Sequence, residues 1–232
     1  MVDYGTPMLN LNQVLSRLKQ ALEQRQPFSI VRFGHAEMYV INEATWPEAS
    51  WDFSEYSTYC GITGPLPNMS RDIIEALLEA DIAGLGDHTP SWQIVMNKIF
   101  QHYDLVIKRS CSAWISHQMV KSEEFFQLLQ GKRIVLLGRR GAEGAAKFEQ
   151  RGIKVVAALP LEGYEQINPT LASLGKLPAF DLVLAAAGVP ATIICPRIAE
   201  KYRTCALDFG HALDIVIDGE EGFDFDFSFG RL

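Results

Sequence analysis

Apolar runs alternate with amphipathic segments along most of the chain. The runs are rich in β-branched and aromatic side chains and end near Gly, Pro or Asp, as buried strands do; they cover residues 28–33, 132–138, 152–158, 180–188 and 204–210. Strands that are apolar on both faces and alternate with helices indicate a parallel sheet covered on both sides. The sequence therefore predicts an α/β fold with a mostly parallel sheet, formed by one domain over residues 1–232.

Amphipathic segments between these runs predict helices. In residues 9–24, Leu and Val recur at helical spacing with charged residues between them. Further helices are expected from residue 38, over 72–80 and 89–102, up to 130, up to 150, over 164–174 and over 190–202. Residues 81–86 and 104–108 predict two short strands. Residues 42–69 predict an irregular region in which aromatic residues form either a packed lid or a wall for stacking a sugar or base.

The net charge of −7 is concentrated at one end of the chain. Residues 211–232 hold six acidic residues and one basic residue, so the remainder is almost neutral. It therefore lacks the basic field that binds nucleic acid, and we expect no nucleic-acid partner. Within the acidic end, residues 223–229 alternate Phe with acidic or polar residues, which suits an edge strand or a partner-bound arm.

Cysteine spacing and hydropathy favour a cytoplasmic protein. The four cysteines form no Cys-x-x-Cys pair. The most apolar run, residues 182–191, is far shorter than the roughly 20 residues that cross a bilayer. We expect no transmembrane segment.

The densest cluster of reactive side chains follows the strand at 28–33. Arg32, Gly34, His35 and Glu37 lie within six residues, and the two last side chains are close enough in sequence to converge on one cation or one phosphate-bound metal. An equally good interpretation is that Arg32 pairs with Glu37 while His35 caps the next helix.

Ligands of an open parallel sheet bind beyond the carboxyl ends of its strands. This rule brings together four loops, at residues 34–37, 138–141, 188–190 and 208–211. The loop from Gly138 to Gly144 has Gly-x-x-Gly-x-x-Gly spacing, which is not the dinucleotide fingerprint. Its Arg139 and Arg140 at a helix N-terminus suit a phosphate, although a solvated turn has the same composition.

A second dense cluster spans Asp208 to Asp214. Asp208 ends a strand, where it would orient an acceptor hydroxyl or act as a base, and Asp214 would hydrogen-bond His211 or cap the last helix. A purely structural role for both Asp214 and His211 fits the same residues.

Two of these segments resemble the GT-D-type glycosyltransferases. Residues 28–37 are similar to the family's Arg-(Phe/Ile)-Gly-Asp-Gly-Glu segment and match it at Arg32, Gly34 and Glu37, with His35 in place of Asp. Residues 206–214 are similar to the Ala-(Leu/Ile)-Asp-(Ile/Phe)-Gly-His-x-Leu-Asp ending of such sequences. A further segment matches at Ser116, with His117 beside it.

The resemblance implies a Rossmann-like glycosyltransferase of the hexosyltransferase type. Its donor would be a nucleoside-diphosphate sugar, a UDP-sugar in this family, and its acceptor a hydroxyl of a glycan or glycoconjugate. Together with the loops at the sheet edge, the resemblance assigns donor binding to Arg32, Gly34, Ser116, Gly138, Arg139 and Arg140. Catalysis is assigned to Glu37, Asp208 and His211, and a divalent ion, Mn²⁺ or Mg²⁺, to His35 and Glu37. A homo-oligomer is compatible with it.

Two other function classes fit the same sheet. One is a non-catalytic nucleotide- or sugar-binding module in which His35 has removed metal activation. The other is a dehydrogenase or methyltransferase, which the failed glycine fingerprint and the lack of an acidic residue near 158 disfavour.

Overall fold

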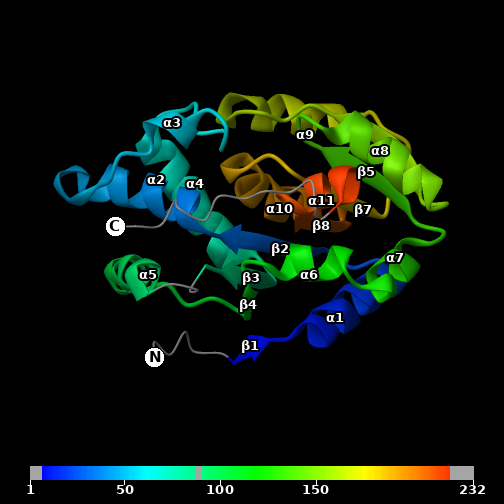
Figure 1. Cartoon of the computed structure of the whole chain (residues 1–232), viewed down its shortest axis with the longest axis horizontal. Coiled ribbons are helices and arrows are strands. Elements are labelled where there is room, and N and C mark those ends of the chain that lie inside the picture. The colour runs from blue at the N-terminus through cyan, green and yellow to red at the C-terminus, as the bar shows by residue number, and fades with distance from the viewer. Residues whose placement is uncertain (1–6, 87–89, 220–232) are drawn as a thin grey trace.

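All strands of the described residues, 7–86 and 90–219, belong to one parallel sheet in the computed structural model (Figure 1). The sheet has eight strands in the order β1-β4-β3-β2-β8-β7-β5-β6. They are β1 (Met8–Leu9), β2 (Phe28–Phe33), β3 (Ile82–Leu85), β4 (Ser110–Ser112), β5 (Arg133–Leu137), β6 (Lys154–Leu159), β7 (Leu182–Ala185) and β8 (Cys205–Asp208). The α/β, parallel-sheet prediction is confirmed.

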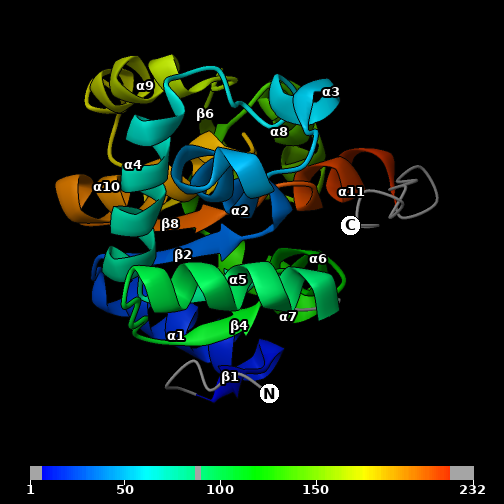
Figure 2. The same cartoon turned by 90° about the vertical axis from the view of Figure 1, so that its left-hand side faces the viewer.

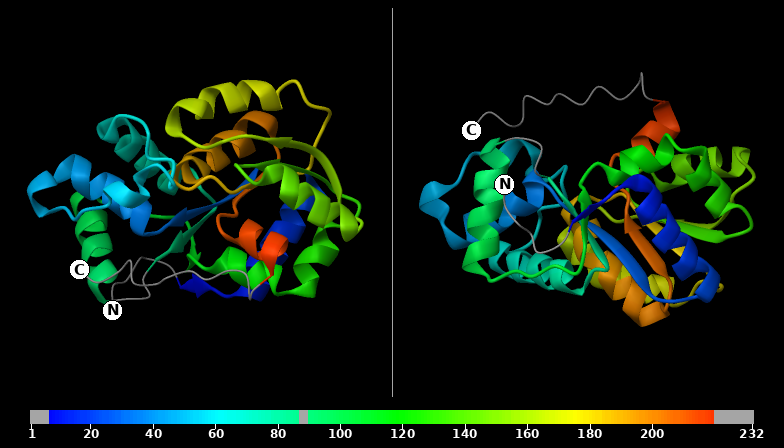
Figure 3. Two further views of the ribbon diagram at one scale, coloured as in Figure 1. Left: turned by 45° about the horizontal axis from the view of Figure 1, so that its top comes forward. Right: turned by 90° about the horizontal axis from the view of Figure 1, so that it is seen from below.

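Helices cover both faces of this sheet (Figures 2 and 3). One face carries α2 (His35–Thr45), α4 (Leu66–Glu79), α5 (Pro90–His102), α9 (Ile167–Leu174) and α10 (Val189–Tyr202). The other carries α1 (Leu11–Gln24), α6 (Ile115–Val120), α7 (Glu123–Leu129), α8 (Gly141–Gln150) and α11 (Ala212–Asp218). Three short helical segments, η1 (Pro47–Ala49), α3 (Ser54–Ser57) and η2 (Tyr164–Gln166), lie between them in sequence. Two apolar cores result, one on each side of the sheet.

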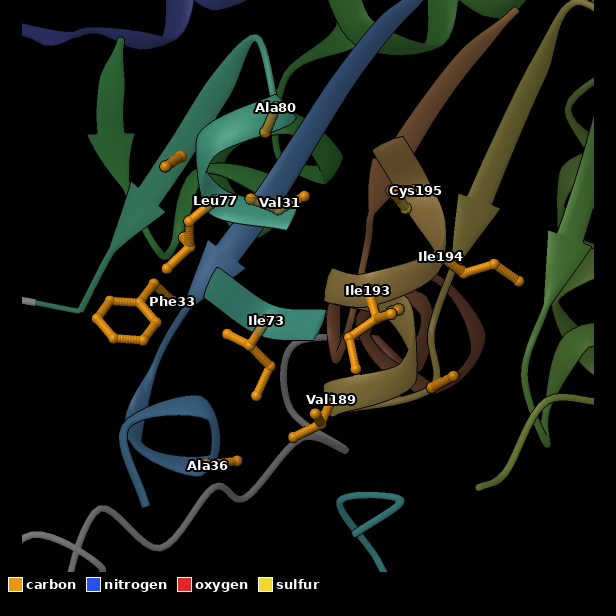
Figure 4. Close-up of a cluster of buried hydrophobic side chains, with 14 of the residues drawn as sticks. Val31, Phe33, Ala36, Ile73, Leu77, Ala80, Val189, Ile193, Ile194 and Cys195 are labelled. Carbon is orange, nitrogen blue, oxygen red and sulfur yellow. The ribbon is translucent and has the colours of Figure 1, made fainter. Parts of the chain in front are cut away.

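Alternation along the strands divides their side chains between the two cores. In β2, Val31 and Phe33 belong to the core under α4 and α10, whereas Phe28 and Ile30 belong to the core under α1. Figure 4 shows Ile73 of α4 and Ile193 of α10 in the same cluster as Val31 and Phe33. Strands that are buried on both faces consist of nearly unbroken apolar residues, so they could be predicted from the sequence.

Three local expectations were wrong. Residues 104–108 form no strand, because Asp104 takes a left-handed backbone conformation with φ of 47° and turns the chain there. The strand forms later, as β4, and pairs with the unpredicted β1. Helix α4 begins at Leu66 rather than near residue 72, so part of the region expected to be irregular is helical.

The carboxyl ends of β5, β7 and β8 lie level with one another, and β2 runs on past the end of β8 to Phe33. Ala185 of β7 pairs with Asp208 of β8 and with Leu137 of β5, while Ile30 of β2 pairs with Leu207. The helices that follow the neighbouring strands β2 and β8, namely α2 and α11, pack on opposite faces of the sheet. Such a switch point is where ligands of open α/β sheets bind.

Candidate active site

The β2–β8 switch point is built around the hydroxyl of Thr192, in the first turns of α10. Its Oγ1 lies 2.9 Å from Asp208 Oδ2, 3.1 Å from Glu37 Oε1 and 3.0 Å from the carbonyl oxygen of Arg32. Both carboxyl groups are buried, with 6% of Glu37 and 4% of Asp208 exposed. Three segments that are distant in sequence are thus joined at one fully buried side chain.

The hydroxyl of Thr192 carries one proton, yet three acceptor oxygens lie within reach of it. A second proton on a carboxyl group satisfies another of these contacts. Asp208 is suited to hold it, because burial raises the pKa of its carboxyl to about 7, against the opposing effect of Arg32 and with a further rise from Glu37. The site therefore contains a carboxyl group that titrates near neutral pH.

The side chain of Arg32, in β2, reaches the loop that follows β8. A side chain on Gly210, whose φ is +47°, would meet the guanidinium of Arg32 at 1.7 Å. Within the described residues, the buried Nε of Arg32 has no hydrogen-bond partner. A buried N–H without an acceptor is costly, so this atom offers a hydrogen bond to an incoming group.

Glu37 also lies in the first turn of α2. Its Oε2 accepts a hydrogen bond from the N–H of Gly34 at 2.9 Å, so both of its oxygens have protein partners. The bond satisfies one of the free N–H groups at the helix start, where a negative charge is also favourable. The local geometry of Gly34 and Glu37 is accordingly set by helix capping.

Two imidazoles, those of His211 and His117, lie close enough to Arg32 to be affected by its charge. Burial lowers the pKa of His211 to about 3, and Arg32, His117 and His35 lower it further. Burial also lowers the pKa of His117 to about 4, again with a contribution from Arg32. His211 and His117 are therefore neutral at pH 7, where an imidazole can accept a proton.

The two adjacent arginines of the β5–α8 loop have different partners. The guanidinium of Arg140 binds Asp214, Asp218 and Glu143 at 2.8, 2.6 and 2.9 Å. The guanidinium of Arg139 lies 5.0 Å from the ring centre of Tyr59 and forms no ion pair with a described residue. Arg139 is thus the cation of this loop that is available to a ligand. Asp214 is the ion-pair partner of Arg140.

The remaining predicted donor-binding residues have distinct surroundings. Gly138, with φ of +135°, packs on the backbone of Ala186 so closely that a Cβ would lie 2.2 Å from the Ala186 oxygen. Ser116 is 1% exposed, and its hydroxyl finds no hydrogen-bond partner among the described residues. The structure thus gives Gly138 a packing role and leaves Ser116 with an unused hydroxyl.

The residues expected for a metal ion do not form a complete coordination set. The ring of His35 packs on Phe53 and Trp92, with ring centres 5.6 and 6.0 Å apart, and both oxygens of Glu37 are hydrogen-bonded. The described residues contain no group of three or more His, Cys, Asp or Glu side chains arranged to hold a metal. These residues do not fit a metal centre made by the protein alone.

Sequence reasoning missed two contributors to the site. Thr192 was hidden in the apolar run of α10, although a hydroxyl between Ala191 and Ile193 is itself a signal. Tyr59 was placed in an aromatic region without a partner, yet its hydroxyl lies 3.1 Å from His211 Nε2. The predicted residues Arg32, Glu37, Asp208 and His211 are brought together; Arg140 is turned to the acids of α11.

A cavity outside the switch point lies beside α4, α9 and α10. The buried carboxylate of Asp72 accepts hydrogen bonds there from Tyr164 at 2.9 Å and from Arg197 at 2.8 Å, and Arg71 binds it from the other side. Because its cations are already paired, this cavity is best explained by helix packing.

The sequence of residues 9–216 matches the model of the GT-D fold-like domain family. The chain belongs to that family. The resemblance drawn from residues 28–37 and 206–214 is thereby confirmed. No curated protein matches the sequence.

Three solved structures of the domain of unknown function 1792 share the fold. A selenomethionine-substituted structure has a TM-score of 0.61 and 16% identity, over 94% of this chain and 81% of that one. A structure described as a new glycosyltransferase from Streptococcus sanguinis has a TM-score of 0.59 and 19% identity, over 93% and 84%. A third, described as a distinct glycosyltransferase fold, has a TM-score of 0.60 and 15% identity, over 94% and 81%. The fold is that of a GT-D-type glycosyltransferase domain.

A search of the described helices finds none with the length and apolar character required to cross a bilayer. The predicted edge strand or arm at 223–229 lies outside the described residues.

Proposed function

We propose that this protein is a glycosyltransferase that moves a sugar from a nucleoside-diphosphate sugar, a UDP-sugar, to a hydroxyl group of a glycan. The observation that carries the proposal is the meeting of Arg32, Glu37, Asp208 and His211 at the β2–β8 switch point of a GT-D fold-like chain. A relative of the same fold is described as a glycosyltransferase. The hexosyltransferase type, a cytoplasmic location and a homo-oligomer stay predictions.

Fixed positive charge would bind the diphosphate of the donor. Arg32 offers a buried N–H without a partner, and Arg139 offers a guanidinium without a carboxylate. Guanidinium groups bind phosphate oxygens through paired, charge-assisted hydrogen bonds. The hydroxyl of Ser116, buried and unused, would serve the nucleotide.

His211 is the better candidate for the base. Asp208 is buried beneath Thr192, whereas His211 is partly exposed and neutral at pH 7. The oxygen of the acceptor would bond to C1 of the donor sugar, the bond from C1 to the phosphate oxygen would break with its electrons on the diphosphate, and the acceptor proton would pass to His211. The negative charge of a bound diphosphate raises the pKa of a nearby imidazole and so makes His211 a stronger base.

A divalent ion stays a prediction of the family resemblance. His35 and Glu37 would contribute to holding it only together with oxygens of the diphosphate, because they make no complete set themselves. Such an ion supplies positive charge to the departing diphosphate. The steps assigned above to protein side chains are independent of it.

The experiment is a screen of nucleotide-sugars for donor hydrolysis, with and without Mn²⁺, using the wild type, Arg32→Gln and Lys19→Gln. Lys19 is an exposed residue of α1 that forms one surface ion pair with Glu23, so it controls for loss of a positive charge elsewhere. We expect hydrolysis of one donor, lost in Arg32→Gln and retained in Lys19→Gln. Tight UDP binding without hydrolysis or transfer would instead favour the non-catalytic binding module.

A further inference from the structure

Tyr59 lies on a turn that is attached to the carboxyl edge of the sheet. The carbonyl of Cys60 accepts a hydrogen bond from the N–H of Val189 at 2.9 Å, and Gly61 packs on Pro190. Gly188 approaches the same turn so closely that a Cβ would lie 2.3 Å from the Cys60 oxygen. The backbone beside Tyr59 is thus held on the loop between β7 and α10.

From this fixed position the side chain of Tyr59 reaches the loops on either side. Its ring lies nearly parallel to that of His211, with an interplanar angle of 15° and centres 5.9 Å apart, and its hydroxyl lies 3.1 Å from Nε2. The guanidinium of Arg139 lies 5.0 Å from the same ring centre. Tyr59 therefore connects the loops after β8 and β5, which flank β7 in the sheet.

Nearly half of Tyr59, 48%, is exposed although the ring contacts two polar side chains. Packing of the core does not require such a residue, since the turn is held by its backbone. An exposed aromatic ring between a neutral imidazole and a guanidinium fits a role at a ligand site better than a structural one.

The protonation state of His211 bears on which group donates the hydrogen bond. Burial disfavours the protonated form of its imidazole most, and Arg32 of β2, His117 of α6 and His35 of α2 add to this effect. A phenol O–H is the stronger donor facing a neutral ring nitrogen, which favours donation from Tyr59 to Nε2 and thus a tautomer with the imidazole proton on Nδ1. That tautomer presents Nε2 as the proton acceptor.

We propose that Tyr59 is a positioning residue that orients the imidazole of His211, with Nε2 as acceptor, and the guanidinium of Arg139 for sugar transfer. The role rests on the proposed function, in which the acceptor hydroxyl replaces the phenol at Nε2 and then transfers its proton there. The phenol of Tyr59 thus marks the place of the acceptor hydroxyl.

The test uses Tyr59→Phe, Tyr59→Leu and, as a matched control, Tyr103→Phe. Tyr103 also makes a phenol hydrogen bond, 2.7 Å to Thr45, but away from the switch point. Histidine ¹⁵N NMR of the nucleotide-free protein, assigned with His211→Gln, reports the tautomer of His211. Hydrolysis of UDP-glucose and UDP-N-acetylglucosamine gives kcat and KM, and calorimetry gives the affinity for UDP.

We expect the His211 resonances to shift in Tyr59→Phe and not in Tyr103→Phe. Because the acceptor displaces this hydrogen bond before the chemical step, its loss acts on the free enzyme. Tyr59→Phe should lower kcat/KM about five- to tenfold, because the tautomer with Nε2 as acceptor is no longer selected. Tyr59→Leu should in addition weaken UDP binding, because Arg139 loses its ring. Melting temperatures separate these effects from misfolding. If Tyr59→Leu does not fold, Tyr59→Phe still tests the proposal, because it retains the ring and its packing.

The proposal is overturned if His211 has its proton on Nε2, or if Tyr59→Phe matches the wild type in both resonances and kcat/KM. If the wild type binds no UDP and turns over no donor, the proposed function fails. The NMR comparison still decides whether Tyr59 orients His211 in that case.

Discussion

The guanidinium of Arg32 occupies the space that any side chain on residue 210 would need. A Cβ on Gly210 would lie 1.7 Å from Arg32 Nη1, and the φ of Gly210, +47°, belongs to a region that favours glycine. Because residue 210 is a glycine, the side chain of Arg32 can extend from β2 to the loop that follows the neighbouring strand β8. The position of the guanidinium therefore depends on the conformation of that loop.

Gly210→Ala is therefore expected to displace Arg32. We predict a loss of UDP affinity of about tenfold or more, because the donor loses an oriented guanidinium. Gly131→Ala is the control: its φ is +71° but no atom lies within 4 Å of its added Cβ, so it carries only the backbone strain of about 1 kcal/mol. Urea unfolding and calorimetry with UDP measure both effects. Equal UDP affinities of the two variants would show that Arg32 does not depend on Gly210.

Asp208 should make stability depend on pH. Its pKa is raised by burial from 3.8 to about 7, so the folded protein holds a proton that the unfolded chain has lost between these values. This contribution is fully present below about pH 4 and is lost as the pH rises through about 7. Asn resembles the protonated carboxyl in shape and does not titrate.

We accordingly expect Asp208→Asn to gain stability relative to the wild type as the pH rises from about 5 to about 8, by roughly 2 kcal/mol. The low pKa values of His117 and His211 lower stability in acid, but they do so in both proteins and cancel in the difference. Chemical unfolding across this range measures the effect. A difference that is constant with pH would show that Asp208 is ionised throughout.

The sequence predicted the strands that carry the site better than those at the edge. Strand β2 is apolar on both faces, so its signal does not depend on distant partners. Strand β4 contains Ser110, Cys111 and Ser112, which have no strong strand preference; β3 and β1 on either side hold it in place. Residues 104–108 had the stronger local pattern, but a left-handed Asp104 ends any strand there.

For the site, clusters of polar residues in the sequence were informative, but the sequence did not show which side chains pair with one another. Arg32, Glu37, Asp208 and His211 were recognised because each lies in a cluster of polar residues after an apolar strand. The partners of Arg140, Asp214 and Asp218, are more than seventy residues away in sequence, so nothing local indicated that its charge is already balanced. Thr192 and Glu37 are still farther apart in sequence, so their contact could not be predicted either.

Mn²⁺ alone should bind weakly. His35 is packed on aromatic rings, and Glu37 has hydrogen bonds to both oxygens, so neither is free to hold an ion without a further ligand. We expect Mn²⁺ to change the melting temperature by less than about 1 °C in the absence of nucleotide. If an ion joins the site, its effect should require UDP. A marked rise with Mn²⁺ alone would show that the protein itself has a metal centre.

Arg139 and Arg140 are adjacent in sequence, but substitutions of the two should have different effects on stability and on UDP affinity. Arg140 is held by Asp214 and Asp218 of α11, so its loss leaves a cluster of like charges at the helix. Arg139 lies over the ring of Tyr59 and forms no ion pair with a described residue, so its loss changes little in the folded structure.

Arg140→Gln is therefore expected to lower the melting temperature while changing UDP affinity less than threefold, because its role is to hold α11. Arg139→Gln should weaken UDP binding by about tenfold, with a melting temperature near that of the wild type, because a single guanidinium–phosphate contact contributes about 1–3 kcal/mol. Raising the salt concentration should reduce both differences, since partly exposed charges are screened. Calorimetry and thermal unfolding of the two variants in parallel make the comparison. The opposite pattern, with UDP affinity lost in Arg140→Gln, would mean that the donor displaces the acids of α11 from Arg140.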